Sequence, residues 1–377
     1  MLRIFVTGDH HIGMKYSGHE QGAKLVQARV DAFEGMVRTA NTEGCGLFVI
    51  TGDLFDTTTS ATKQEIRQLL SLLSGFEGTV AVLPGNHDYY DESSPAQVWR
   101  YFRDEVAAYN NVMLLSAFRP YDLTVNGERV RLYPAFCETK HSVPNQNNLG
   151  WMKNLDMEDG VYHIGVAHGS VEGESMDEKG IYFPMKRAEL AAIPVDAWLI
   201  GHTHVPFPRD LTTEYAAVRD NVFNAGTHAQ TDVSCNTEGL CFVVEMDENK
   251  VVRAKKVVTG SLCFYRKAIT VSANEMESIL HRELADVADN SVVDVILSGA
   301  VTMDEYDRRH EILEAALARF VEGTYNCYDL SKLITAEVVA AEFAETSFSA
   351  GFLTALLDDP KEATMVYELL KSLKEGK

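Results

Sequence analysis

Carboxylate and histidine side chains directly follow several apolar segments of this chain. The segment IFVTGDHHIG, residues 4–13, runs from Ile, Phe and Val into Asp9, His10 and His11. The arrangement recurs at four later places: Asp53 and Asp56 in ITGDLFD, Asn86, His87 and Asp88 in PGNHD, His168 in VAHGS, and His202 with His204 in IGHTH. Since the carboxyl ends of parallel strands line one crevice of an α/β sheet, we expect these side chains to meet.

Each of these short motifs has an ordinary structural explanation when it stands alone. A Gly-Asp pair after a strand usually begins a turn, and Gly and Asn favour turns in the same way. The His-x-His pair of IGHTH places both rings on one face of a strand, which is also compatible with a surface patch. Five such motifs in one chain, each ending a buried segment, instead predict one shared site.

The residue types in this set predict a pair of divalent cations. Imidazole, carboxylate and amide ligands suit manganese, iron, zinc or magnesium, and the absence of cysteine argues against a structural zinc site. Two ions about 4 Å apart can hold the attacking and leaving oxygens of a phosphoryl transfer. Such ions repel by roughly 17 kcal/mol at an effective dielectric constant of 20, so a bridging carboxylate is required. Asp53 is the expected bridge.

The elements that must position these residues alternate between strands and helices. Apolar runs predict strands over 2–8, 47–53 and 79–88, and helical spacing predicts helices over 22–44 and 61–75, the second ending at Gly75. Later segments predict a hairpin over 123–136 that turns at Asn126-Gly127, strands over 161–170 and 197–204, and a hairpin over 239–258. The expected fold is α/β (α+β), a two-sheet β-sandwich flanked by helices.

The pattern changes near residue 270. We therefore expect two domains, residues 1–270 carrying the site and a smaller, mostly helical domain over 271–377. VVDVILSGAV, residues 292–301, reads as an isolated strand, and from Asp304 onward the pattern is almost wholly helical.

Charge and composition narrow the functional classes. The 377 residues carry a formal net charge of -21, which counts against a nucleic-acid binder that acts alone, because such proteins usually show a basic face. Bound dications would reverse the field near the site. The six cysteines form no C-x-x-C pair and are expected to be reduced packing residues. No apolar run is long enough for a membrane span and no signal peptide is recognisable, so we expect a cytoplasmic protein with no membrane partner.

The ordered motifs GDHHIG, GDLFD, GNHD, HGS and GHTH resemble the signatures of the calcineurin-like metallophosphoesterase superfamily. The forms DHHIG, GDLFD and HGSV…YFPM…GHTH are similar to the SbcD-type DNA double-strand-break repair exonucleases, including their YhaO-like branch. The resemblance covers about residues 1–270. It implies a two-metal phosphodiesterase, with Mn²⁺ as the expected metal, that hydrolyses DNA by attack of a metal-bound hydroxide.

The resemblance also implies a role for each site residue. Asp9, His11 and His204 would hold the first ion, Asn86, His168 and His202 the second, and Asp53 both. His87 would protonate the leaving oxygen, and Asp56 would orient His87. Among the other histidines, His10 is expected to have a structural or surface role. The roles of His163 and His228 are left undecided, and His228 could line the cleft. Four histidines are expected to be exposed: His19, His141, His281 and His310.

The chain departs from this family in two places. The segment after GHTH reads NAGTH, with Ala225 where a proline-glycine turn is usual, and the C-terminal part is acidic where a DNA-contacting surface would carry lysine and arginine. We therefore expect DNA binding to need a partner, an SbcC-type coiled-coil ATPase, and the resemblance also implies a homodimer. The partner would dock on apolar residues of the terminal helices, although these could equally pack their own domain: Phe343, Phe348, Phe352, Leu353, Leu356 and Leu357.

Two alternatives to a DNA nuclease follow from the same residues. The first is a phosphodiesterase or phosphatase that acts on nucleotides, other small phosphoesters or phosphoproteins, which the acidic charge favours. The second is a scaffold without chemistry, which the complete set of ligand types argues against.

Overall fold

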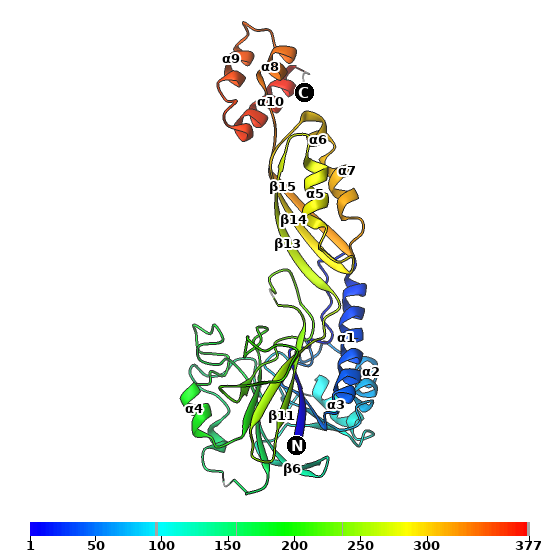
Figure 1. Ribbon diagram of the computed structural model, residues 1–377, viewed down its shortest axis with the longest axis vertical. Coiled ribbons are helices and arrows are strands. Elements are labelled where there is room, and N and C mark those ends of the chain that lie inside the picture. The colour runs from blue at the N-terminus through cyan, green and yellow to red at the C-terminus, as the bar shows by residue number, and fades with distance from the viewer. Residues whose placement is uncertain (95–96, 156, 236, 375–377) are drawn as a thin grey trace. The chain divides into compact units, whose positions relative to one another are not determined.

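The computed structural model describes residues 1–94, 97–155, 157–235 and 237–374. The chain divides into two compact units, Met1–Leu262 and Cys263–Lys377 (Figure 1). Sequence analysis places this division after residue 270. In the structure the second unit begins at Cys263, the first residue of the strand Cys263–Ser272, which pairs with Ser291–Ala300 of the same unit.

The first unit is built on two β-sheets. The first sheet has the order β4-β3-β2-β1-β11-β12-β9, and its early strands are parallel, as predicted. β1 lies in its middle and pairs with β2 on one side and antiparallel with β11 on the other. The strands are β1 (Leu2–Thr7), β2 (Leu47–Ile50), β3 (Thr79–Val82), β4 (Val112–Leu114), β9 (Ala216–Ala217), β11 (Leu240–Met246) and β12 (Val252–Val258).

The second sheet of this unit has the order β10-β8-β7-β6-β5. The strands are β5 (Tyr121–Val125), β6 (Glu128–Ala135), β7 (Tyr162–His168), β8 (Ala197–Gly201) and β10 (Val222–Phe223). One buried apolar cluster contains residues of both sheets, including Ile4 and Val49 of the first with Ile164 and Leu199 of the second. The two sheets therefore pack face to face, and the predicted fold class is confirmed.

Helices cover the outer faces of this sandwich. α1 (Gly22–Thr42), α2 (Lys63–Ser74) and α3 (Val98–Val106) share a buried cluster with the first sheet, and α4 (Arg187–Ala192) does so with the second. α2 begins with a capping box between Thr62 and Glu65 and ends at Gly75, as predicted. A short 3-10 helix, η1, spans Gly150–Met152.

The predicted turn at Asn126-Gly127 is confirmed. Asn126 has φ 50° and Gly127 has φ 84°, the conformation of a type I′ hairpin turn. The predicted strand over 79–88 is shorter, because β3 ends at Val82 and the segment LPGNHD leaves the sheet to enter the site.

The second unit holds a three-stranded parallel sheet in the order β13-β14-β15. β14 (Ser291–Val301) contains the segment expected to be an isolated strand, and it is the central strand of this sheet, between β13 (Cys263–Ser272) and β15 (Glu322–Lys332). The expectation of an almost wholly helical chain after Asp304 is wrong over β15. The helices are α5 (Met276–Leu284), α6 (Met303–Asp307), α7 (Arg309–Leu317), α8 (Ala336–Glu342), α9 (Phe348–Thr354) and α10 (Pro360–Lys374).

Two further expectations can be compared with the structure. Across the described parts of the chain, none of the helices has both the length and the apolar character of a membrane span. All six cysteines are free, as expected. Burial raises the pKa of Cys45 and of Cys241 to about 12, which keeps both thiols protonated.

Candidate metal centre

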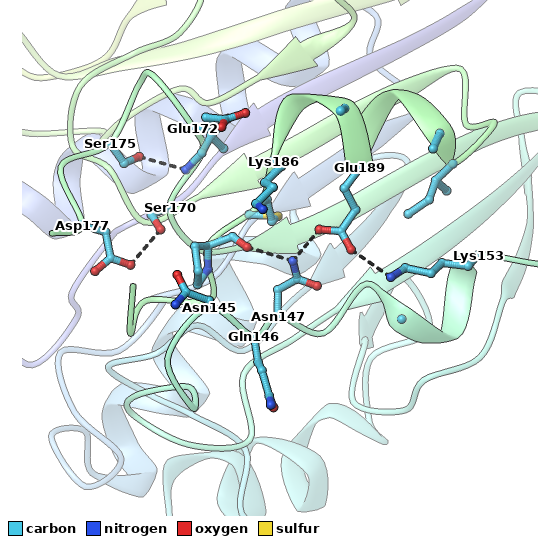
Figure 2. A pocket seen from close by; sticks show the side chains of 17 residues that line it. Asn145, Gln146, Asn147, Lys153, Ser170, Glu172, Ser175, Asp177, Lys186 and Glu189 are labelled. Atoms are coloured by element: carbon cyan, nitrogen blue, oxygen red, sulfur yellow. Dashed lines mark hydrogen bonds and ion pairs between the residues drawn. The ribbon is translucent and has the colours of Figure 1, made fainter. Parts of the chain in front are cut away.

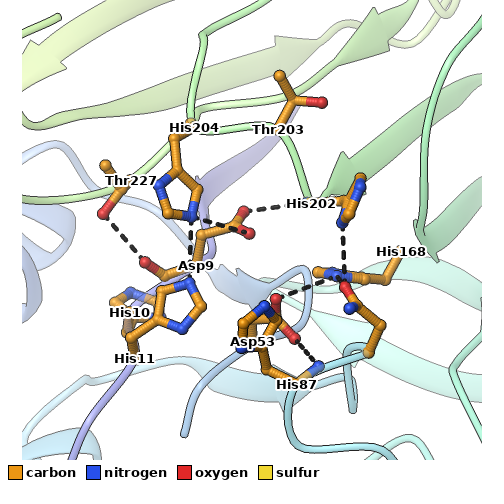
Figure 3. A network of polar contacts seen from close by, with 12 residues as sticks. Asp9, His10, His11, Asp53, His87, His168, His202, Thr203, His204 and Thr227 are labelled. Atoms are coloured by element: carbon orange, nitrogen blue, oxygen red, sulfur yellow. Dashed lines mark hydrogen bonds and ion pairs between the residues drawn. The ribbon is translucent and has the colours of Figure 1, made fainter. Parts of the chain in front are cut away.

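The predicted site residues lie at or just after the ends of strands of both sheets, and His168 is the last residue of β7 (Figure 3). Four of them have positive φ angles: Asp9 (52°), His11 (47°), Asp53 (49°) and His202 (113°). Such angles are uncommon for residues other than glycine and cost of order 1–3 kcal/mol each, so they persist only where the surroundings enforce them. Outliers of this kind cluster at functional sites, and here four fall within one site.

The first cluster contains Asp9, His11 and His204, whose ligand atoms all lie within 4.8 Å of one another. The Nε2 atoms of His11 and His204 face each other at 3.1 Å, and Asp9 Oδ1 lies 3.8 Å from His204 Nε2. Asp9 Oδ1 is buried and makes no hydrogen bond to any of the described residues. A buried acceptor without a partner is costly, and a cation held between these three side chains would remove that cost.

The second cluster is centred on the amide oxygen of Asn86. This oxygen lies 2.9 Å from His168 Nε2 and 3.0 Å from His202 Nδ1. The other nitrogen of His168, Nδ1, donates to the backbone carbonyl of Thr51 at 2.9 Å. In the neutral ring this bond assigns the proton to Nδ1 and leaves Nε2 as a ligand atom directed at the cluster.

Asp53 lies between the two clusters. Its carboxylate falls within 4.8 Å of ligand atoms of Asp9 in the first cluster and His168 in the second. Oδ2 lies 3.3 Å from His168 Nε2, and Oδ1 accepts the backbone N–H of His87 at 2.8 Å. This is the position that a bridging ligand requires.

Two glycines allow these loops to approach so closely. A Cβ atom on Gly52 would lie 2.2 Å from His168 Nδ1, and one on Gly85 would lie 2.2 Å from Asp53 Oδ1. Any other residue at either position would displace a predicted ligand. The glycines of ITGD and PGNHD are therefore part of the site.

Burial and the close approach of charged groups shift the pKa values of several predicted ligands. Burial raises the pKa of Asp9 to about 6, and the nearby Asp53 carboxylate adds to the shift. Burial lowers the pKa of His202 to about 4 and of His204 to about 3, so both rings are neutral at pH 7, as metal ligands must be. For His168, burial is outweighed by the Asp53 carboxylate, and its pKa rises to about 9.

His87 lies at the edge of the site and contacts Asp56, but through a different group from the one expected. Its Nδ1 atom donates to the backbone carbonyl of Asp56 at 3.2 Å. The Asp56 carboxylate lies instead 3.6 Å from His11 Nδ1. The Asp56 backbone therefore orients His87, and its side chain faces a ring of the first cluster.

Asp88 has a positional role that the sequence did not assign. Its buried carboxylate accepts the backbone N–H of Gly85 at 2.7 Å and that of Phe55 at 3.0 Å. Asp88 thus ties the loop carrying Asn86 to the loop carrying Asp53. Only its place directly after GNH suggested a part in the site.

Arg29 of α1 is a second residue that sequence analysis missed. Its buried guanidinium donates to the carbonyl of His10 from Nε at 3.3 Å and from Nη2 at 2.6 Å, and from Nη1 to the carbonyls of Ala229 and Gln230 at 3.1 Å each. The carbonyl of His10 stands between two positive-φ residues, Asp9 and His11. Arg29 therefore holds the backbone that carries the first cluster.

The remaining histidines fall outside the centre. His10 is fully buried, with Nε2 3.0 Å from Thr7 Oγ1, which agrees with a structural role. His228 is also fully buried, packs on the His10 ring at 4.7 Å and does not line the cleft. His163 is buried between Tyr133 and the carbonyl of Glu158. His141, His281 and His310 are exposed as expected, whereas His19 is half-buried.

The donors fit a pair of divalent cations. They are carboxylate, imidazole and amide groups, and a buried carboxylate oxygen and two opposed ring nitrogens point into the space between them. The structure brings together all seven predicted ligands, namely Asp9, His11, Asp53, Asn86, His168, His202 and His204. The division of these ligands between two ions stays a prediction.

Residues 2–206 match the family model of the calcineurin-like phosphoesterases, which is more than half of the chain. The chain belongs to this family of metal-dependent phosphoester hydrolases. No curated protein matches.

Several solved structures are similar at low identity. The protein TT1561 of Thermus thermophilus is 12% identical, with a TM-score of 0.40 over 68% of this chain and 99% of that one. The NAD nucleotidase of Haemophilus influenzae is 12% identical, with a TM-score of 0.39 over 69% of this chain and 49% of that one. A dimetal phosphatase from Danio rerio is 11% identical, with a TM-score of 0.36 over 69% and 99%.

Proposed function

We propose that this chain is a two-metal phosphodiesterase that hydrolyses DNA. The observation that carries the proposal is the position of Asp53 between two clusters of metal-ligand side chains, beside His87. Asp9, His11 and His204 would hold one ion, and Asn86, His168 and His202 the other. When bound, manganese ions supply positive charge for the phosphate oxygens and lower the pKa of water.

His87 is the proposed acid for the leaving oxygen. Its Nδ1–H is used by the carbonyl of Asp56, so Nε2 can donate a proton only when the ring carries both protons. Burial lowers the pKa of His87, which makes the imidazolium a stronger acid. This step of the reaction should therefore weaken as pH rises through that pKa.

DNA is the proposed substrate because the motif forms of the site resemble those of SbcD-type exonucleases. The net charge of -21 opposes DNA binding by this chain alone, so a partner is part of the proposal. The proposed partner is an SbcC-type coiled-coil ATPase, and the cytoplasm is the proposed compartment. A homodimer is proposed from the same resemblance.

Exposed apolar residues on the last two helices support a docking surface for this partner. Phe348 and Phe352 of α9 are 82% and 42% exposed, and three residues of α10 at a spacing of four are also exposed: Met365, Leu369 and Leu373. Leu353 is fully buried, and three others pack against the same internal cluster: Phe343, Leu356 and Leu357. The predicted anchors therefore divide into packing residues and a surface stripe.

Activity measurements test this proposal. Manganese-loaded protein, with and without the partner ATPase, should hydrolyse linear DNA and bis-p-nitrophenyl phosphate, and His87→Ala should lose roughly 10²- to 10⁴-fold in rate on DNA. Cyclic nucleotides and phosphopeptides serve as competing substrates. DNA left intact even with the ATPase would refute the nuclease, and equal turnover by His87→Ala would refute the role of His87.

A further inference from the structure

A second concave site lies on the face of the first unit that carries α4 and η1 (Figure 2). Its volume is about 940 Å³, at the upper end of the roughly 300–1,000 Å³ typical of small-molecule sites. The segment between β7 and α4 forms one wall, and a second wall is formed by Asn145, Gln146, Asn147, Gly150 and Lys153. None of the predicted metal ligands lines it.

This pocket shares its wall with the second metal cluster. Ser170, which lines the pocket, follows His168 by two residues, and its hydroxyl donates to Asp177 at 3.0 Å. Ser175, also in the lining, hydrogen-bonds the hydroxyl of Thr203, which stands between His202 and His204. The pocket is therefore built on the loop that follows His168 and contacts the loop that carries His202 and His204.

The lining combines an apolar floor with a polar rim. Val171, Met185 and Ile193 contribute apolar surface to the lining. Asn145, Gln146 and Lys186 are exposed and form the rim (Figure 2). Within the described parts of the chain, the side chains of Asn145 and Gln146 make no hydrogen bond and no acid pairs with Lys186. These amide and ammonium groups are free to bind a ligand.

One side of the rim is held in place by Glu189 of α4. Its carboxylate accepts the amide N–H of Asn147 at 2.7 Å and pairs with Lys153 at 3.2 Å. Asn147 also donates to the carbonyl of Pro184 at 2.8 Å, which joins the two walls. The pocket is thus formed before a ligand arrives, which reduces the entropic cost of binding.

The charges of the lining exclude a strongly anionic ligand as the main occupant. Two lysines, Lys153 and Lys186, face three acids, Glu172, Asp177 and Glu189, so the formal sum is 2 − 3 = −1. A flat group with apolar faces and polar edges fits better, because the floor can contact its faces and the amides can donate to and accept from its edges. A nucleobase on its sugar has these properties.

We propose that this pocket binds the nucleoside next to the phosphodiester that is cleaved. The inference rests on the proposed phosphodiesterase function and adds a substrate class, nucleoside diesters over simple phosphoesters. The free ammonium of Lys186 would meet a phosphate attached to the same nucleoside.

The test compares two substrates that differ in the nucleoside. Ala188→Trp places a large side chain in the pocket from α4, and Ala191→Trp puts the same side chain on the same helix outside the lining. Manganese-loaded proteins are assayed on the p-nitrophenyl ester of thymidine 5′-monophosphate and on bis-p-nitrophenyl phosphate. Because base contacts of this kind are worth roughly 5- to 150-fold in binding, Ala188→Trp should raise KM for the nucleoside ester by that factor relative to the simple ester.

Further arms keep the outcomes distinct. Asn145→Gly with Gln146→Ala removes two exposed side chains and should raise the same KM ratio without lowering the unfolding temperature. Glycine replaces Asn145 because this residue has φ 60°, where alanine would be strained. If the pocket variants also have a raised KM for a short DNA strand, the pocket binds a nucleoside of nucleic acid. If KM is raised only for the thymidine ester, the pocket binds free nucleotides. Both results support a nucleoside site. Equal effects on both esters, or none, would overturn the inference while leaving the phosphodiesterase intact. A wild-type protein inactive on both esters would refute the proposed function instead.

Discussion

Replacing Gly52 with alanine should remove the second metal ion and leave the fold largely in place. Gly52 has φ 106°, and an added Cβ would lie 2.2 Å from His168 Nδ1 and 2.7 Å from Cγ of the same ring. That ring is fixed by its hydrogen bond to the carbonyl of Thr51, so it must turn away or the backbone must shift. The substitution therefore acts on a predicted ligand without changing any ligand atom.

The expected cost has two parts. An alanine in a positive-φ conformation costs roughly 1–2 kcal/mol, and an overpacked buried contact costs roughly 1–3 kcal/mol more. Gly127→Ala is the matched control, because Gly127 also has a positive φ, 84°, but an added Cβ meets nothing within 4 Å. The control should show the backbone cost alone, about 1–2 kcal/mol.

Chemical denaturation of the metal-free proteins would measure these stabilities, and elemental analysis after dialysis against manganese would count the ions. Gly127→Ala should keep two ions and wild-type phosphodiesterase activity. Gly52→Ala should lose one ion and most of the activity. The reasoning fails if Gly52→Ala retains both ions at wild-type affinity, or if the two variants have the same stability.

Three further predictions concern other parts of the chain. Arg29→Lys and Arg29→Met should both weaken manganese binding by about tenfold or more, since lysine keeps the charge but cannot donate from two nitrogens to the carbonyl of His10. Calorimetric titration would give the Kd, and wild-type affinity in Arg29→Lys would show that the charge alone matters. Lys332→Met should destabilise the C-terminal unit by about 1.5–3 kcal/mol, because it removes the charge-assisted contacts that the buried ammonium makes with Asp307 and Glu368. Hydrogen exchange in α10 would report the loss, and unchanged protection would contradict this prediction. Cys45 and Cys241, whose pKa values are raised to about 12, should resist thiol reagents at pH 8 in the folded protein and react after unfolding, because the reactive thiolate forms only as pH rises toward the pKa. Rapid labelling of these two thiols in the native protein would contradict this prediction.

The position of the site could be predicted because its residues follow buried strands. A strand ends where its apolar run ends, so Asp9, Asp53 and His168 were expected to meet, and their ligand atoms lie within 4.8 Å of one another. The turn at Asn126-Gly127 was predictable for a similar reason, because both residues tolerate positive φ. In each case local sequence and final structure agree.

Other features depend on contacts that no local pattern records. The Asp56 carboxylate lies beside His11 and the Asp56 carbonyl beside His87, and the spacing of Asp56 from Asp53 does not show which group faces which ring. Arg29 looks like an ordinary polar residue of a helix, and its buried role depends on carbonyls about 200 positions away. Interactions between residues so distant in sequence are set by the tertiary fold.

The strand β15 was missed because its sequence lacks strand alternation. In EGTYNCYDLSK most side chains are polar and most positions before Leu330 are partly or fully exposed. Its pairing with the apolar strand β14, a neighbour in space, gives it a regular extended backbone. The context-dependence of strand formation therefore outweighs the weak local signal.

The central place of β1 has a consequence for how the protein is made. β1 pairs with β11, which is translated more than 230 residues after it, at residues 240–246. The carbonyl of Asp9 likewise accepts a hydrogen bond from the hydroxyl of Thr227, which is translated much later than Asp9. A nascent chain stopped at residue 206, where the family match ends, would already contain every predicted ligand and still lack the support that holds the first of them. Acquisition of metal should therefore come late in biosynthesis.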